Sequence, residues 1–216
     1  DPKKERGCVM KKRLVLVVLA LALVPTVAFS GVFDFGVGAT AQFTNNFDVS
    51  NTGSFDWAQL GKFENYGFGA DIRTRLLFAE IDIVGLYSQA PHPTTQETLH
   101  SISGLVTGGI SLDLLGLLRI GVGLGPRIYA LIDSDGNTSV WNQNGSLDAT
   151  TNFGEAFMKA PMTYRATVDF KLGNILLGVN YTVDSDGFTF EDMNTAKLAP
   201  KFAEGKLGAS VVFVLF

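Results

Sequence analysis

The sequence predicts an all-β protein, an eight-stranded antiparallel up-and-down transmembrane β-barrel preceded by a signal peptide. Apolar residues alternate with polar residues or glycine along most of the chain after residue 30, which places the two sets on opposite faces of strands. The connections between the alternating segments are in turn very short and long, and the number of segments is even. These features together are typical of a barrel that spans a membrane.

The N-terminal 30 residues have the pattern of a secretory signal. Met10 opens the stretch MKKRLVLVVLALALVPTVAFS, in which a basic segment precedes the apolar run Leu14–Val24. Ala28-Phe29-Ser30 then supplies the small-x-small pattern that signal peptidase recognises. We therefore predict export by the Sec pathway with cleavage at Ser30, a translation start at Met10, and residues 1–9 as an upstream extension.

A transmembrane anchor is the alternative interpretation of this segment. Leu14–Phe29 is shorter than the roughly 20 residues that a helix needs to cross a bilayer, and Pro25 interrupts it. Cys8 precedes the apolar run, so we do not interpret it as a lipidation site. The predicted mature domain, residues 31–216, then contains no cysteine and is stabilised without disulfides.

Charge limits the partners of this domain. The chain has 17 basic and 21 acidic residues, and residues 1–30 hold six of the bases and two of the acids. Residues 31–216 therefore carry 11 bases and 19 acids, a net charge of −8. Such an acidic domain is a poor candidate for binding nucleic acid. The sequence also suggests no cofactor and no metal.

The first four segments each show period-two alternation. In GVFDFGVGATAQF, Phe33 and Phe35 share one parity, whereas Asp34 and Thr40 share the other with glycines. In the next three segments, Asp71, Arg73 and Arg75, then Glu80 and Asp82, and then Asp113 lie on the inward parity of their strands. The eight predicted strands are about 31–44, 64–76, 78–88, 99–114, 117–132, 159–172, 175–184 and 203–216.

The last four segments follow the same rule. In LLRIGVGLGPRIYALIDSDG, Arg119 and Arg127 share a strand face, and Pro126 predicts a bulge or a weak spot because it removes one ladder donor. Gly173-Asn174 joins the sixth and seventh strands as a two-residue hairpin turn. The final strand has two equally apolar parities, so its lipid-facing side stays open.

The connections separate into two classes. Those near Leu77, Gly116 and Gly173 are tiny, whereas 45–63, 89–98, 133–158 and 185–202 are long and polar. A soluble β-sandwich or lipocalin-like barrel also has eight alternating strands, but its polar face meets water. Here the apolar parity is almost free of charge over about ten residues per strand, and short and long connections alternate strictly. Both observations favour the membrane barrel.

Residues 31–216 resemble the small outer-membrane β-barrels of Gram-negative-type envelopes, the OmpA-like, OmpX-like and outer-membrane protein W-like groups. The resemblance is carried by the signal peptide, the eight alternating strands and the terminal Phe216 preceded by Val214 and Val212. It implies a monomer in outer-membrane lipid, with Phe216 recognised by the barrel-assembly machinery. It is specific for architecture and loose for function, because such barrels serve as anchors, adhesins, porin-like channels and lipid enzymes.

Charged residues on the inward parity explain the arginines in apolar surroundings. Five acids and six bases are expected in the narrow lumen, and near balance predicts mutual pairing, because a buried unpaired charge is costly. The predicted lumen charge cluster is Asp71, Arg73, Arg75, Glu80, Asp82, Asp113, Arg119, Arg127, Arg165, Asp169 and Lys171.

Three functions follow from this architecture. The first is a non-enzymatic surface protein with a salt-bridged, closed lumen and long loops that bind a host or envelope partner. The second is a narrow channel for small solutes, hydrophobic ones included, since ionisable groups at membrane depth often mark a path. The third is a lipid-modifying enzyme, which the residues disfavour: His92 lies between prolines, and His100 has the opposite parity to Ser101 and Ser103.

Two loop features remain. Asp133-Ser-Asp135-Gly136-Asn137 superficially resembles a calcium loop, but the sixth and twelfth positions are Thr138 and Asn144, so we interpret it as a polar turn. Aromatic residues in the long connections are expected to form an interfacial belt, contact a partner or line a channel mouth. They are Phe47, Phe55, Trp57, Trp141, Phe153, Phe157, Phe188 and Phe190.

Overall fold

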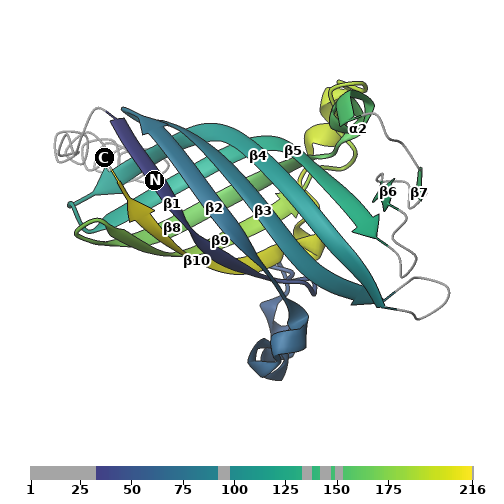
Figure 1. Ribbon diagram of the computed structural model, residues 1–216, viewed down its shortest axis with the longest axis horizontal. Helices are drawn as coiled ribbons and strands as arrows, with labels where there is room; N and C mark the ends of the chain where they lie inside the picture. Colours follow the sequence, from purple (N-terminus) through teal and green to yellow (C-terminus); the bar gives the residue numbers. More distant parts are fainter. Residues whose placement is uncertain (1–32, 92–97, 133–137, 142–146, 149–152, 216) are drawn as a thin grey trace, which may run out of the picture.

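Eight long antiparallel strands form a closed barrel, which confirms the predicted eight-stranded antiparallel architecture (Figure 1). The predicted signal peptide lies outside the described residues. The computed structural model describes residues 33–91, 98–132, 138–141, 147–148 and 153–215. The barrel strands are β1 (Phe33–Phe43), β2 (Tyr66–Leu76), β3 (Ala79–Pro91), β4 (Thr98–Leu114), β5 (Leu118–Ile132), β8 (Met162–Leu172), β9 (Ile175–Asp184) and β10 (Lys206–Val214).

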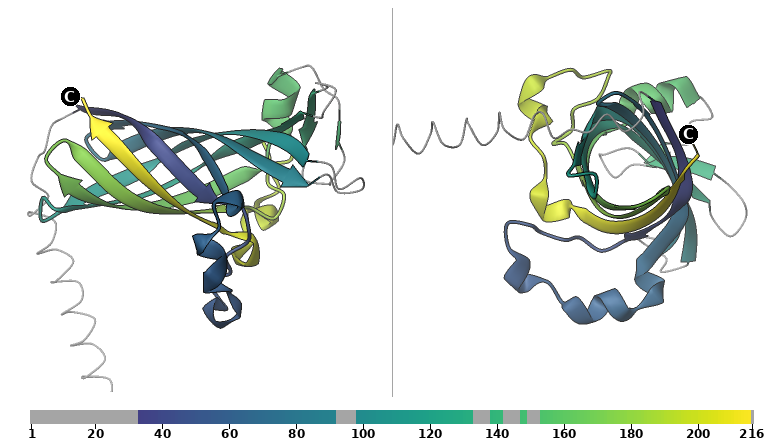
Figure 2. Two further views of the ribbon diagram at one scale, coloured as in Figure 1. Left: turned by 60° about the horizontal axis from the view of Figure 1, so that its bottom comes forward. Right: turned by 90° about the vertical axis from the view of Figure 1, so that its left-hand side faces the viewer.

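Each barrel strand pairs with its neighbours along the chain, and the last strand closes the ring on the first. The closing pair is antiparallel and places Val37 opposite Phe213. β4 pairs with β5, and the first part of β5 pairs in turn with β8, from Leu118 opposite Phe170 to Pro126 opposite Met162. An end-on view shows the resulting closed ring (Figure 2). The topology is therefore up-and-down, with no open edge among the barrel strands.

The three predicted short turns are present at one end of the barrel. Two residues separate β2 from β3, three separate β4 from β5, and two separate β8 from β9. Glycine suits the left-handed backbone at Gly116 and Gly173, whose φ angles are 69° and 60°. Leu77 and Leu115 adopt the same region with φ angles of 58° and 54°, which is strained for a side chain.

The long connections contain elements that alternation did not predict. Their residues make short helices and a small extension of the sheet, so β2 and β10 begin two and three residues later than expected. These elements are η2 (Thr52–Ser54), η3 (Trp57–Gly61), η4 (Phe63–Asn65), β6 (Thr138–Trp141), β7 (Leu147–Asp148), α2 (Phe153–Lys159), η5 (Thr195–Leu198) and η6 (Phe202–Glu204). None of the helices that the structure describes is long and apolar enough to cross a membrane.

Pro126 marks an interruption in β5. The ladder to β4 pairs Leu105 with Arg127 and Gly108 with Leu124, and it skips the two residues between them on each strand. The register is the same on both sides of the gap, so Pro126 creates the predicted weak spot without a bulge. Beyond this point β5 leaves β8 and pairs with β6, with Tyr129 opposite Trp141.

The open question about the last strand has a clear answer. Val211, Phe213 and Leu215 are exposed, whereas Val212 is fully buried. The parity that contains Val212 therefore faces the lumen, and its neighbouring parity forms the outer surface. Phe216 and Ser30, the predicted assembly and cleavage positions, lie outside the described residues.

Candidate functional site

The interior of the barrel is dominated by polar and charged side chains. Of the described residues, 21 buried side chains are polar or charged, and 11 are hydrophobic. All eleven residues of the predicted charge cluster occupy inward-facing positions, and ten of them are buried, with Lys171 half-buried. A small hydrophobic cluster also faces inward, and it consists of Val84, Leu86 and Leu105. Apolar packing therefore supplies only a minor part of the contacts inside this barrel.

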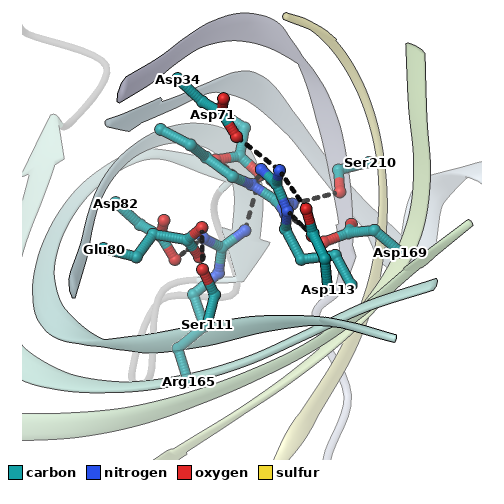
Figure 3. A network of polar contacts seen from close by, with 11 residues as sticks. Asp34, Asp71, Glu80, Asp82, Ser111, Asp113, Arg165, Asp169 and Ser210 are labelled. Carbon is teal, nitrogen blue, oxygen red and sulfur yellow. Dashed lines mark hydrogen bonds and ion pairs between the residues drawn. The ribbon is translucent and has the colours of Figure 1, made fainter. Parts of the chain in front are cut away.

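Two arginines hold the first ion-pair network (Figure 3). Arg165 on β8 donates to Asp71 on β2 and to Asp82 on β3, both at 2.6 Å. Arg73 on β2 contacts Asp169 on β8 at 2.6 Å and Asp71 at 2.9 Å. The network thus joins strands from opposite sides of the ring. Because all five side chains are buried, each charge is neutralised by direct contact rather than by water.

A second network lies near the short turns. Arg119 on β5 contacts Asp113 at 2.8 Å and Asp34 at 2.6 Å. Arg75 contacts the same two carboxylates, at 2.9 Å to Asp34 and 3.1 Å to Asp113, and Lys171 contacts Asp113 at 2.7 Å. Asp34 was absent from the predicted cluster. With it, the cluster has six acids and six bases, so the formal charges of the cluster balance.

Mutual pairing does not extend to every member of the predicted cluster. The Glu80 carboxylate accepts a hydrogen bond from Ser111 at 2.8 Å, and within the described part of the chain no basic nitrogen lies within 4.0 Å of it. Arg127 stands apart in the same way, with Tyr129 and Gln42 as its hydrogen-bond partners. The prediction of general pairing is therefore wrong for these two residues. Arg127 lies at a different depth from the two networks, whereas Glu80 lies opposite Arg75 across β2 and β3, but the guanidinium of Arg75 pairs with Asp34 and Asp113.

Glycines on the inner surface make room for the ion pairs. A Cβ atom on Gly178 of β9 would lie 1.9 Å from Oδ1 of Asp169, and one on Gly121 of β5 would lie 2.6 Å from Oγ1 of Thr167. Both distances are far below van der Waals contact, so any larger residue would displace the polar side chain. The glycine-rich polar parity is thus a packing requirement of the charged interior.

The outer surface of the barrel is apolar, in contrast to the charged lumen. Between the level of Phe68 and the short turns, the outward positions of the described barrel strands carry no charged side chain. Large apolar side chains are exposed there instead. They include Ile81, Ile83, Ile102, Val106, Ile110, Leu112, Ile120, Val122, Val168, Leu177, Val179 and Val211, each between 40% and 60% exposed.

Aromatic side chains border this apolar zone at both ends. Phe68 pairs directly with Tyr87 across β2 and β3 on the loop side, and both are exposed. Exposed Phe33, Phe78 and Phe213 lie at or close to the short turns. About nine residues at about 3.3 Å each separate Phe68 from the turn at Leu77, which for strands tilted by about 40° gives a height of roughly 23 Å.

The predicted loop aromatics largely pack on one another. Phe47 contacts Phe55 with ring centroids 4.9 Å apart, and Phe55 contacts Trp57 at 5.1 Å. Phe157 on α2 stacks on Phe190 at 5.4 Å. Trp57 nonetheless remains 59% exposed, on a segment that lies outside the ring (Figure 2). It therefore retains apolar surface for a membrane interface or a partner.

The geometry gives no support to a hydrolytic centre at His100. Its Nδ1 lies 2.6 Å from the Tyr87 hydroxyl on the outer surface, whereas the neighbouring Ser101 is buried inside the barrel. His92 and residues 133–137 of the calcium-like loop lie outside the described residues. In the part of the chain that the structure describes, no cluster of His, Cys, Asp and Glu side chains has the geometry of a metal site.

Comparisons with known proteins find similarity of structure alone. No family model and no curated protein matches the sequence. The chain is similar to Ail, the attachment invasion locus protein of Yersinia pestis, solved in complex with the heparin analogue sucrose octasulfate; identity is 9% and the TM-score 0.41, over 84% of this chain and 96% of Ail. It is also similar to Neisserial surface protein A, with 15% identity and a TM-score of 0.40, over 85% and 97% of the two chains.

Proposed function

We propose that this protein is an outer-membrane surface protein without enzymatic activity. Its barrel spans the membrane with a lumen closed by ion pairs, and its long loops lie outside the cell, where they contact a host or envelope partner. The proposal includes export by the Sec pathway, residence in outer-membrane lipid as a monomer, and recognition of Phe216 by the barrel-assembly machinery.

The observation that carries the proposal is the inverted distribution of charge and apolar surface. The lumen contains eleven buried charged side chains and the half-buried Lys171, whereas the outward positions between the two aromatic borders carry none among the described residues. A water-soluble barrel would have the opposite arrangement. The estimated height of roughly 23 Å is close to the apolar band of outer-membrane barrels, about 25 Å, and aromatic girdles at both margins are typical of them.

The closed lumen is favoured by the size of the ring and by its contents. An eight-stranded barrel is just wide enough for side chains to fill. Arg165, Asp71 and Asp169 are almost completely buried and lie across the lumen at one level. Replacing such paired groups with water would require separating ion pairs that hold one another at 2.6 Å.

The membrane location is tested by flotation of the refolded protein with phospholipid vesicles. We expect co-flotation that carbonate washing does not reverse, because an apolar band about 23 Å tall would be buried in lipid. Folding is checked separately by heat-modifiable gel mobility. A protein that folds in water and stays in the aqueous fraction would overturn the proposal.

Loop orientation is tested by adding trypsin to intact cells that produce the protein. Lys62, Lys197 and Lys201 are accessible side chains in the long connections. If these connections are external, trypsin cleaves there without cell lysis and leaves the barrel strands protected. Cleavage that requires permeabilised cells would place the long connections on the periplasmic side.

Planar-bilayer conductance separates the closed barrel from a narrow channel. We expect the folded protein to insert without producing single-channel steps or flux of small solutes. Reproducible steps that change in the Arg119→Ala variant would favour the channel function and make the ion pairs part of a conducting path. The membrane location would stand in either case.

A further inference from the structure

The loop-side mouth of the barrel contains a cavity of about 250 Å³. Arg127 of β5 and Lys206 of β10 both line it, and none of its described lining residues is acidic. The remaining wall offers neutral polar groups, among them Gln42, Ser101 and Tyr129. This cavity lies above the two ion-pair networks, at the end of the lumen that faces the long loops.

Arg127 is a buried cation without a carboxylate partner. It is 3% exposed, and no carboxylate of the described residues lies within 4.0 Å of its guanidinium. Its Nη1 donates to the Tyr129 hydroxyl at 2.9 Å, its Nη2 reaches Gln42 Oε1 at 3.4 Å, and its Nε has no hydrogen-bond partner. Arg165 deeper in the lumen has two carboxylates at 2.6 Å.

Lys206 likewise has no carboxylate partner among the described residues. Its Nζ donates to the Thr44 carbonyl oxygen and, at 2.8 Å, to Oδ1 of Asn46, both of which are uncharged. Asp184 on the adjacent strand accepts a hydrogen bond from Thr163 at 2.5 Å and makes no ion pair within 4.0 Å with either cation. Two positive charges therefore line one cavity without a direct counter-charge in the described part of the chain.

We propose that this cavity binds an oxyanion, the carboxylate, sulfate or phosphate group of a small solute, between Arg127 and Lys206. A buried cation is costly unless a counter-charge meets it, and an anion in the cavity would supply that charge. The Arg127 guanidinium offers such a group its Nη2, which otherwise makes only the long 3.4 Å contact with Gln42 Oε1. The hydroxyls of Ser101 and Tyr129 are further donors.

The volume limits what the cavity admits. Sites for drug-sized ligands have volumes of about 300–1,000 Å³, whereas a water molecule takes about 30 Å³. A cavity of about 250 Å³ therefore fits a small anion or a single acidic sugar, and not an extended chain. The inference does not depend on the membrane location or on a closed lumen.

Isothermal titration calorimetry of the folded full chain in a neutral detergent tests the proposal. Sodium sulfate, sodium phosphate and sodium glucuronate are titrated separately at an ionic strength held constant with chloride. We expect saturable binding of at least one of them, weakened at least tenfold in Arg127→Gln and in Lys206→Gln. Lys201→Gln, which alters an exposed loop cation, is the matched control and should bind as the wild type does.

Measuring stability with and without the anion distinguishes a variant that has lost binding from one that folds poorly. The bound anion should raise the urea midpoint of the wild type, because it binds the folded state alone. Without anion, Arg127→Gln should keep or raise the midpoint, and it should lose the anion-induced increase. Binding of all three anions identifies a single oxyanion as the ligand, and binding of glucuronate alone identifies an acidic sugar. No saturable binding by the wild type, or binding that both variants retain, would overturn the proposal.

Discussion

Charged residues inside this barrel supply the interior contacts that aliphatic side chains supply in the core of a soluble protein. Arg165 is among the largest fully buried side chains, and it joins two carboxylates from β2 and β3. Forming such a pair contributes little net stability, but breaking it is costly, since deletion of one partner leaves an uncompensated buried charge.

Replacing Arg165 with methionine is expected to lower the free energy of unfolding by about 3–5 kcal/mol, because Asp71 and Asp82 would each lose a partner. The measurement is urea unfolding of the lipid-refolded protein, followed by tryptophan fluorescence. The control is Lys197→Met, which removes an exposed pair with Asp192 and should cost at most about 1 kcal/mol. Equal effects of the two changes would show that the lumen pairs are no more important than surface pairs.

Gly178 carries the second residue-scale prediction. An alanine there would place its Cβ 1.9 Å from the Asp169 carboxylate and displace that group from Arg73, at an expected cost of about 1–3 kcal/mol. Gly104 is a suitable control, because an added Cβ meets nothing within 4 Å. The two alanine variants are compared by the same urea titration. A Gly178 variant as stable as the Gly104 variant would mean that Asp169 moves aside without loss.

Strand parity predicted which charges face the lumen but not how they group. It missed Asp34 as a member of the cluster, although this residue is the one acid on the polar parity of the first strand. It also could not separate Arg127 from the other arginines. Parity assigns a face, whereas depth follows from the register and stagger of eight strands, which one sequence does not specify.

Strand β5 shows at the level of elements how the barrel ends and the loops begin. Its first part belongs to the ring, and its last residues pair with β6 outside the ring. The sequence pattern is continuous through this change of partner, so the whole segment was predicted as one strand. The short β6, β7 and α2 lie in what was predicted as a loop, because elements of two to seven residues carry too little periodicity to recognise.

The pairing of the last strand was likewise undecidable from its own residues. Both parities are apolar, and the choice comes from neighbouring strands. Ser210, on the inward parity, lies opposite Thr40 of β1 and accepts a hydrogen bond from Arg73 at 2.8 Å. The register that satisfies these polar groups also turns Phe213 outward. Interactions from other elements, rather than local propensity, therefore determine this strand's faces.

The β5–β8 connection yields a prediction about elements. Replacing residues 136–150 with about six Gly and Ser residues should leave the ring intact, because the β5–β8 ladder ends at Pro126 and does not use them. We expect unchanged heat-modifiable mobility and a change in unfolding free energy below about 1 kcal/mol. The control replaces only residues 142–150, with an equal number of Gly and Ser residues, and so keeps β6. Loss of the folded form would show that β6 and β7 help to close the barrel.

At the scale of the whole molecule, the solvent for each face decides the effect of a charge placed on it. Ile83 lies midway between the short turn and Tyr87, and its side chain is 47% exposed on the outer surface. If that surface meets lipid, Ile83→Arg should lower the free energy of unfolding by about 2–4 kcal/mol in phospholipid vesicles, because an arginine would be placed near the bilayer midplane.

Met193→Arg is the matched control for this change, since Met193 is 64% exposed on the connection before β10. Its expected effect is within about 0.5 kcal/mol, as for other substitutions at water-exposed positions. The comparison requires no knowledge of ligand or partner, and it depends on the outer surface as a whole rather than on one contact. If the two arginine variants were equally stable, the apolar band would have to face water or a protein partner, and the membrane location would be wrong.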